Sequence, residues 1–98
     1  MSDFEKQILL AIASLEEGQV VSYGDIAAMA GNASAPRAVG RFLSSTSFDV
    51  PWWRVVRSDG TLAACNLPEQ RNRLEAEGVV FRTNKIATAP SGRFAENA

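Results

Sequence analysis

The sequence predicts a mainly α-helical fold with a small β-hairpin, built around a helix-turn-helix unit of the winged-helix-like kind. Three observations predict it. Apolar residues recur at helical spacing near the N-terminus. Two short helical segments flank a glycine-containing turn at residues 31–33. An Asp59-Gly60 pair, a strong signal for a hairpin turn, lies between two short apolar runs.

A first helix is expected to run from Ser2 to about Leu15. Ser2 and Glu5 have the spacing of a capping box, in which two side chains satisfy free N–H groups at a helix start. The apolar residues at helical spacing are Phe4, Ile8, Ile12 and Leu15. Gly18 then favours the end of the helix.

The next two helices form the expected helix-turn-helix unit. Ser22 and Asp25 have the capping-box spacing again, and the helix that they begin continues through Met29. After the turn, Ser34 is expected to cap the third helix and Pro36 to occupy its first turn. The buried stripe of that helix is Val39, Phe42 and Leu43.

The last third of the chain predicts a hairpin, a helix and a tail. Residues 54–57 and 61–63 are expected to pair as the hairpin. A final helix is expected to begin at Pro68 and to end at Gly78. We expect one domain over residues 1–82 and a flexible tail over residues 83–98, because little pattern remains there.

The charge distribution allows a nucleic-acid partner, although the net charge is only -1. Residues 1–36 carry one base and five acids, whereas residues 37–93 carry nine bases and five acids. A basic face on a nearly neutral molecule is therefore possible. The helix-turn-helix pattern alone leaves DNA binding open, because most such helix pairs only pack together.

Several classes of function are disfavoured by composition. The chain has one cysteine, Cys65, and no histidine, so an internal disulfide is excluded and we expect no metal site and no cofactor. There is no apolar run of about 18 residues and no basic leader at the N-terminus, so we expect a cytoplasmic protein with no membrane partner.

Trp52 and Trp53 are an unusual pair, because they follow Pro51 in a segment that reads as a loop. Both indoles could pack in the core of a small domain. Alternatively, at least one could line a pocket and stack on a nucleobase. The residues themselves leave these interpretations equally open.

Three motifs follow one another along the chain, namely Ser22-Tyr23-Gly24-Asp25-Ile26-Ala27, Pro36-Arg37-Ala38-Val39-Gly40 and Pro51-Trp52-Trp53-Arg54-Val55-Val56. In order and approximate spacing they resemble the DNA-binding domain of the O6-alkylguanine-DNA alkyltransferases. The resemblance spans roughly residues 4–82. The segment Leu74-Glu75-Ala76-Glu77-Gly78-Val79 also resembles the closing helix of that family.

The resemblance implies that Trp52 and Trp53 replace the cysteine that accepts the alkyl group and the histidine that helps to activate it. An indole offers neither a thiolate nor a base, so alkyl transfer at Trp52 is chemically excluded. The sequence is thus similar to the alkyltransferase-like branch, in which tryptophan commonly replaces the cysteine. A histidine usually follows even there, so Trp53 departs from the pattern.

The resemblance also implies how the domain meets DNA. Arg37 would be a finger that enters the minor groove and fills the space of the flipped base. Tyr23 would contact the phosphate beside the flipped nucleotide. Without the motifs, these would be an ordinary surface arginine and a half-buried tyrosine. The expected DNA-binding residues are Ser22, Tyr23, Ala35, Pro36, Arg37, Gly40 and Arg41. The expected lesion-pocket residues are Tyr23, Trp52, Arg54, Val55, Ala64, Cys65 and Glu77.

The expected function is that of a monomeric, non-enzymatic protein that binds duplex DNA containing O6-alkylguanine and flips the base. By resemblance, its partners would be the damage-recognition proteins of nucleotide-excision repair. One alternative is a helix-turn-helix transcription regulator, although the helix that begins at Pro36 offers few polar side chains for reading bases. Another is an alkyltransferase that uses Cys65, which the absence of histidine disfavours.

Overall fold

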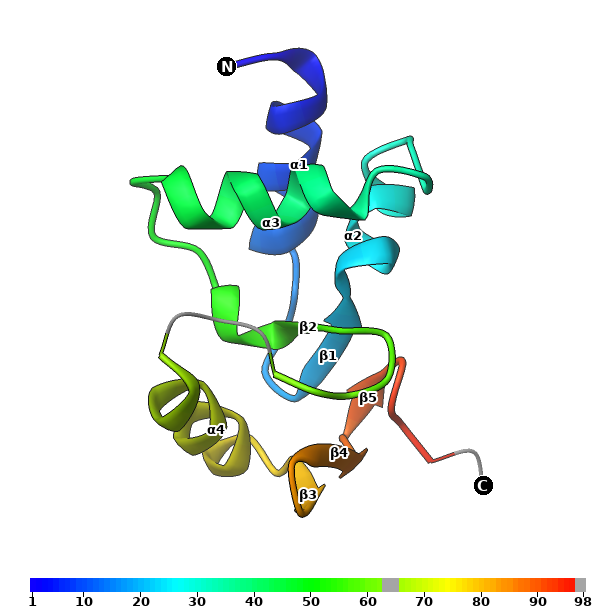
Figure 1. Ribbon diagram of the computed structural model, residues 1–98, viewed down its shortest axis with the longest axis vertical. Helices are drawn as coiled ribbons and strands as arrows, with labels where there is room; N and C mark the ends of the chain where they lie inside the picture. The colour runs from blue at the N-terminus through cyan, green and yellow to red at the C-terminus, as the bar shows by residue number, and fades with distance from the viewer. Residues whose placement is uncertain (63–65, 97–98) are drawn as a thin grey trace.

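The computed structural model describes residues 1–62 and 66–96. Within them the chain forms helices separated by very short strands (Figure 1). The elements are α1 (Asp3–Ala13), β1 (Gln19–Ser22), α2 (Tyr23–Met29), α3 (Pro36–Ser45), the 3₁₀ helix η1 (Trp52–Arg54), β2 (Val55–Val56), α4 (Leu67–Ala76), β3 (Val80–Arg82), β4 (Lys85–Thr88) and β5 (Ser91–Gly92). The mainly helical fold expected from the sequence is therefore confirmed. None of the described helices is long and apolar enough to cross a membrane.

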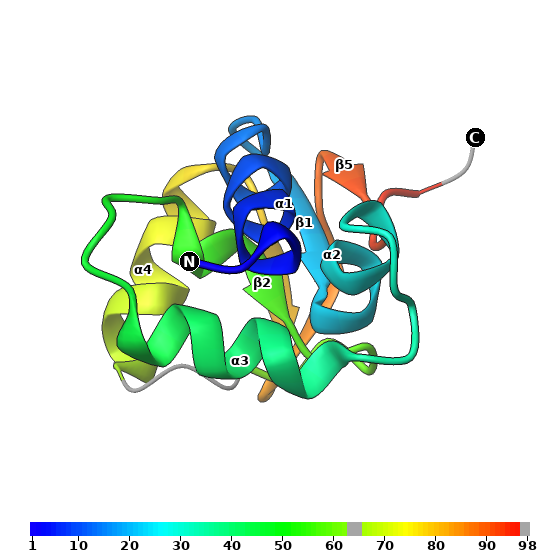
Figure 2. The same ribbon diagram turned by 90° about the horizontal axis from the view of Figure 1, so that it is seen from above.

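A small three-stranded sheet joins the two halves of the molecule. Figure 1 shows α1, α2 and α3 in the upper half and α4 with the β3–β4 hairpin in the lower half. The sheet between them has the order β2-β1-β5, and both pairings are parallel. Seen from above, α3 runs along one outer side of the molecule (Figure 2).

The two halves have separate apolar cores on opposite sides of β1 and β2. Val21 and Val55 pack with α1, α2 and α3, whereas Val20 and Val56 pack with α4 and the β3–β4 hairpin. Successive residues of a strand point to opposite faces, so each two-residue step contributes to both cores. A sheet of only a few residues can therefore hold the two halves together.

Both predicted capping boxes are present. The Ser2 hydroxyl accepts a hydrogen bond from the Glu5 amide, and Ser22 and Asp25 make the equivalent pair at the start of α2. The prediction that Ser34 caps α3 is wrong. The N-cap residue of α3 is Ala35, which provides no side-chain cap. The Ser34 hydroxyl instead donates a hydrogen bond to the Asn32 side chain. Pro36 occupies the first helical position as expected.

The structure corrects the prediction of a hairpin over residues 54–63. The turn itself forms, with the Gly60 amide donating to the Arg57 carbonyl at 2.9 Å. However, β2 pairs with β1 instead of with the segment after the turn, because its two valines are fully buried between both cores. The antiparallel hairpin of the structure lies further along the chain, at β3 and β4.

The predicted flexible tail is wrong for the strands that follow residue 83. Ile86 and Ala89 are buried in the second core, and β5 extends the parallel sheet beside β1. Gly92 is required there, because a Cβ atom would lie 2.3 Å from the Val20 carbonyl oxygen. Pairing with a distant strand orders a segment that has little local pattern of its own.

Candidate nucleic-acid interface

α2 and α3 form a helix pair whose outer helix carries two exposed arginines. Residues 30–35 connect the helices, a longer turn than the sequence predicts. Val39 and Phe42 point into the first core, while Arg37 and Arg41, one turn apart, are exposed. The arginines therefore present their guanidinium groups to an external partner.

Gly40 lies between those arginines without a structural reason for being glycine. It is in the middle of α3, where glycine is less stable than alanine. A Cβ atom built on Gly40 would meet no protein atom within 4 Å. The missing side chain thus leaves open space on the outer side of α3, where another molecule can approach the backbone closely.

The start of α2 is held from two sides. The Asp25 carboxylate accepts hydrogen bonds from the Ser22 amide at 2.9 Å and from the Arg93 Nε at 2.8 Å. The hydrogen bond from Arg93 lowers the pKa of Asp25 to about 2. Ser22 is itself buried, whereas Tyr23 is half-buried against the first core. Tyr23 is therefore positioned by an ordered helix start.

The two tryptophans occupy different environments in η1. Their rings meet edge to face, with centroids 6.0 Å apart and planes at 90°. The Trp53 indole packs on the second core and donates a hydrogen bond from Nε1 to Glu77 Oε2 at 2.8 Å. The guanidinium of Arg73 lies over the Trp53 ring, 4.5 Å from its centroid. Both tryptophans are half-buried, but Trp53 is held by its hydrogen bond to Glu77, whereas Trp52 packs edge to face against Trp53 and lies 5.9 Å from the Arg73 guanidinium.

Glu77 connects three segments behind η1. Its carboxylate accepts hydrogen bonds from the Arg54 guanidinium and from the amide of Gly18 at 2.8 Å, in addition to the Trp53 indole. Burial by itself would raise the pKa of Glu77, but the hydrogen bonds from Arg54, Gly18 and Trp53 outweigh it and the pKa is lowered. Arg54 also donates to the Leu15 carbonyl at 2.9 Å. The contacts of Arg54 therefore brace the η1 turn against the end of α4 and the end of the α1 segment.

Gln70 supports η1 as well, and sequence reasoning missed it. It is fully buried on α4, and its Nε2 atom donates to the carbonyl oxygens of Trp53 and Val55, both at 3.2 Å. Its Oε1 atom has no hydrogen-bond partner within the described residues. The available signal was a polar residue four positions before Leu74, on the buried stripe of the helix.

The structure brings together some of the expected pocket residues and leaves others undescribed. Trp52, Arg54 and Val55 lie together in and after η1, with Glu77 behind them. Ala64 and Cys65 lie outside the described residues. A metal site is not formed by the side chains of residues 1–62 and 66–96, since no suitable cluster of ligands is found there.

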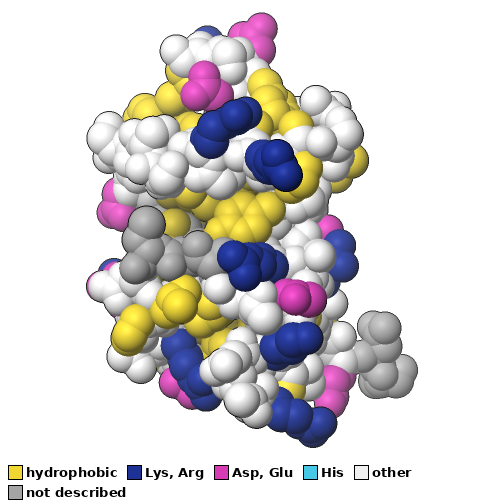
Figure 3. Space-filling view, viewed as in Figure 1, with side chains coloured by type: hydrophobic (Ala, Val, Ile, Leu, Met, Phe, Trp, Pro, Cys, Tyr) yellow, Lys and Arg dark blue, Asp and Glu magenta, His cyan; other side chains and the backbone are white. Residues whose placement is uncertain are grey.

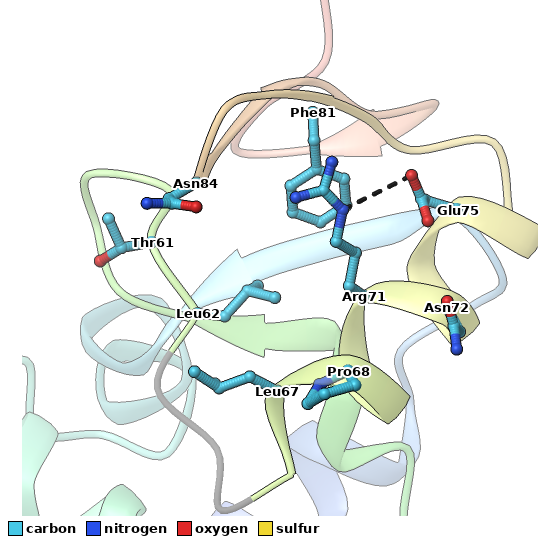
Figure 4. Close-up of a pocket in the computed structure, with 9 residues that line it drawn as sticks. All are labelled: Thr61, Leu62, Leu67, Pro68, Arg71, Asn72, Glu75, Phe81 and Asn84. Atoms are coloured by element: carbon cyan, nitrogen blue, oxygen red, sulfur yellow. Dashed lines mark ion pairs between the residues drawn. The ribbon is translucent and has the colours of Figure 1, made fainter.

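A separate hollow of about 630 Å³ lies between the segment before residue 63, the first turns of α4 and the β3–β4 hairpin (Figure 4). Among its described lining residues are none of Tyr23, Trp52, Arg54, Val55 and Glu77. Its lining residues are Thr61, Leu62, Leu67, Pro68, Arg71, Asn72, Glu75, Phe81 and Asn84. Arg71 partly closes it, with its guanidinium 4.5 Å from the centroid of the Phe81 ring and 3.6 Å from Glu75.

Comparison with known proteins places this geometry in a family. Residues 3–79 match the family described as "6-O-methylguanine DNA methyltransferase, DNA binding domain". The DNA base-flipping protein of Vibrio parahaemolyticus is 39% identical over 92 residues, which cover 89% of this chain and 92% of that protein. A methylated-DNA–protein-cysteine methyltransferase of Saccharomyces cerevisiae is 37% identical, but the matching region covers only 44% of its length. The relatives thus include both base-flipping and methyltransferase proteins.

The same relationship is visible in a solved structure. Alkyltransferase-like protein 1 of Schizosaccharomyces pombe is 33% identical over 91 residues, covering 86% of this chain and 84% of that protein. The crystal structure of S. pombe Atl1 in complex with damaged DNA containing O6-carboxymethylguanine matches with a TM-score of 0.74 and 27% identity. That match covers 100% of this chain and 98% of the other, so it includes β3, β4 and β5, which lie beyond the family match.

Proposed function

Since this chain belongs to the family of the 6-O-methylguanine DNA methyltransferase DNA-binding domain, we propose that it recognises O6-alkylguanine in duplex DNA by flipping the damaged base out of the stack. The protein holds the base without accepting its alkyl group. The observation that carries the proposal is the position of Trp52 on a turn that the Arg54–Glu77 pair braces, together with the exposed Arg37 on α3. Flipping is the route by which proteins reach an atom that stacking hides.

The proposed absence of alkyl transfer rests on the chemistry of Trp52 and Trp53. An indole cannot supply a thiolate, and no histidine exists in the chain to activate one. Moreover, Trp53 donates its indole N–H to the Glu77 carboxylate. The positions that would hold a nucleophile and its base are therefore occupied by Trp52, which offers an aromatic ring, and by Trp53, whose indole is bound to Glu77.

The proposed DNA contacts use α3 and the start of α2. Arg37 enters the minor groove and occupies the space of the flipped base, and its exposure leaves the side chain able to do so. Tyr23 contacts the backbone beside the flipped nucleotide. Gly40 lets α3 approach the groove without a side chain in between. The remaining contacts come from Arg41 and from the backbone of Ala35 at the start of α3.

The flipped base is proposed to stack on Trp52, which base–aromatic stacking makes favourable by about 1–3 kcal/mol. Arg54 and Glu77 keep the turn in place from behind. We further propose that the protein acts as a monomer in the cytoplasm. Because binding repairs nothing, the bound lesion would be passed to the damage-recognition proteins of nucleotide-excision repair.

The test compares affinities for a duplex that carries one O6-methylguanine and for its unmodified twin, at a single salt concentration. Tighter binding to the lesion, with no gain in the intact mass of the protein, is the expected result. Arg37→Ala should remove most of the preference, whereas Lys6→Ala, an exposed substitution on α1, should retain it. Equal affinity for both duplexes would favour a transcription regulator, and a methyl group on Cys65 would reveal an alkyltransferase.

A further inference from the structure

A group of cations lies on the protein surface outside the helix pair. Arg54, Arg71, Arg73 and Arg93 form ion pairs with carboxylates. By contrast, Arg57, Arg82 and Lys85 are exposed and make no ion pair with any described residue. We call these three residues the hairpin cluster, because Arg82 and Lys85 lie on the β3–β4 hairpin and Arg57 lies in the turn that pairs with it through Thr61.

The fold brings the hairpin cluster together from two segments. Arg82 and Lys85 are direct partners across the antiparallel pair of β3 and β4, and both are exposed while Ile86 beside them is buried. Lys85 also forms a bridge with Thr61 at the end of the turn that begins at Arg57. Hydrogen bonds from Thr61 are the main reason that the pKa of Asp59, in the same turn, is lowered. The positive charges of Lys85 and Arg57 lower this pKa further.

The pairing of Arg82 with Lys85 is unfavourable for the protein alone. Like charges directly opposite each other destabilise a pair of strands. The Asp59 carboxylate, which accepts hydrogen bonds from Thr61 and interacts with Lys85 and Arg57, offsets only part of the positive charge of the cluster. An external anion would therefore relieve a repulsion that the fold leaves in place.

The position of the cluster matches the DNA partner. Figure 3 shows Lys and Arg side chains over α3 and again, lower on the same face, over the turn after β2 and the β3–β4 hairpin. This series follows the longest axis of the molecule, which extends 37 Å. A DNA strand that lies along this axis can therefore pass over both groups of cations.

We propose that Arg57, Arg82 and Lys85 form a second phosphate-binding site, which holds the DNA backbone beside the segment that α3 contacts. The inference depends on the proposed function for its duplex partner. The cluster carries no group that reads bases, so it strengthens binding to damaged and undamaged duplexes alike. Log affinity falls as log salt concentration rises, and each phosphate contact makes this slope more negative by about 0.9.

The experiment uses two identical substitutions at exposed lysines. Lys85→Gln should weaken binding to both duplexes on the order of fivefold at moderate salt and should make the salt slope less steep by about 0.9. Lys6→Gln, on α1, removes the same charge and should change neither quantity. Thermal unfolding should show that Lys85→Gln remains folded, since it removes the repulsion with Arg82.

Each outcome separates the inference from the proposed function. If Lys85→Gln and the double variant Arg57→Gln/Lys85→Gln bind like Lys6→Gln, with the same salt slope, the phosphate site is refuted, and an acidic protein partner would become the better occupant. If wild-type protein shows no preference for the lesion but Lys85→Gln still makes the slope on undamaged DNA less steep, the proposed function fails while the cluster stands.

Discussion

The Arg54 guanidinium and the Glu77 carboxylate form a two-pronged ion pair that is nearly withdrawn from solvent. The Nη2–Oε2 distance is 2.8 Å and the Nε–Oε1 distance is 3.0 Å, and the side chains are 14% and 9% exposed. The pair joins η1 to the end of α4, and Glu77 also binds the turn at Gly18. The turn that carries Trp52 is therefore held by charge and not by apolar packing alone.

Glu77→Gln is expected to lower the free energy of unfolding by about 3 kcal/mol, because it leaves the Arg54 charge buried without a counter-ion. Urea denaturation measures this change. Glu75→Gln, two residues earlier, removes an exposed pair with Arg71 and should cost at most about 1 kcal/mol. Equal effects of the two substitutions would show that the buried pair is not important for stability.

Substitutions of the two tryptophans are expected to have different effects, on stability at Trp53 and on DNA affinity at Trp52. Trp53→Phe removes the hydrogen bond to the Glu77 carboxylate and should destabilise the protein by about 1.5–3 kcal/mol, with the lesion preference retained. Trp52→Ala should instead weaken binding to the lesion duplex by about 1–3 kcal/mol, since it removes the stacking surface. Denaturation and duplex affinities measured on both variants check this division, and a reversed pattern would contradict it.

Gly40→Ala is expected to stabilise the protein while weakening its binding to DNA. In the middle of α3, alanine should raise the free energy of unfolding by about 0.5–1 kcal/mol, because the added methyl group meets no protein atom. The same methyl group would stand between α3 and the groove. Asn72→Ala on α4 is the control, which should stabilise its helix through higher propensity and leave DNA affinity unchanged. Unchanged affinity in Gly40→Ala would exclude close approach at this position.

Arg93→Gln is expected to make stability less sensitive to acid. The lowered pKa of Asp25, about 2, means that its contribution is full above its ordinary value near 3.8 and is lost as the pH falls through about 2. At neutral pH the variant should be less stable by about 1 kcal/mol, a value reduced by the partial exposure of the pair. Unfolding curves at pH 7, 4 and 2 should show the difference from wild type shrinking below pH 4. A difference that is constant with pH would rule out Asp25 as its source.

Local chemistry made the first half of the fold predictable from the sequence. Each capping box lies within four consecutive residues, and Pro36 acts on the turn in which it stands, so these signals need no distant partner. That Trp52 stands where the alkyltransferases have their reactive thiol was implied by the resemblance of the surrounding motif, which is also local. The placement of Arg37 on an exposed helix followed from the same local pattern.

Long-range pairing decided the rest. The order of β5 depends on β1, which lies about seventy residues earlier, and Gly92 shows its fit only beside the Val20 carbonyl. Val55 and Val56 do not pair in the expected hairpin, because they pair in parallel with β1 between the two cores. The Trp53–Glu77 hydrogen bond, the buried Gln70 and the backbone bridge between Thr61 and Lys85 have the same origin. The helices and the capping boxes of α1 and α2 could be predicted from the sequence, because the interactions that form them are local. The strand partners and the ion pairs between distant segments depend on the tertiary structure, because their free energies arise between residues that lie far apart in the chain.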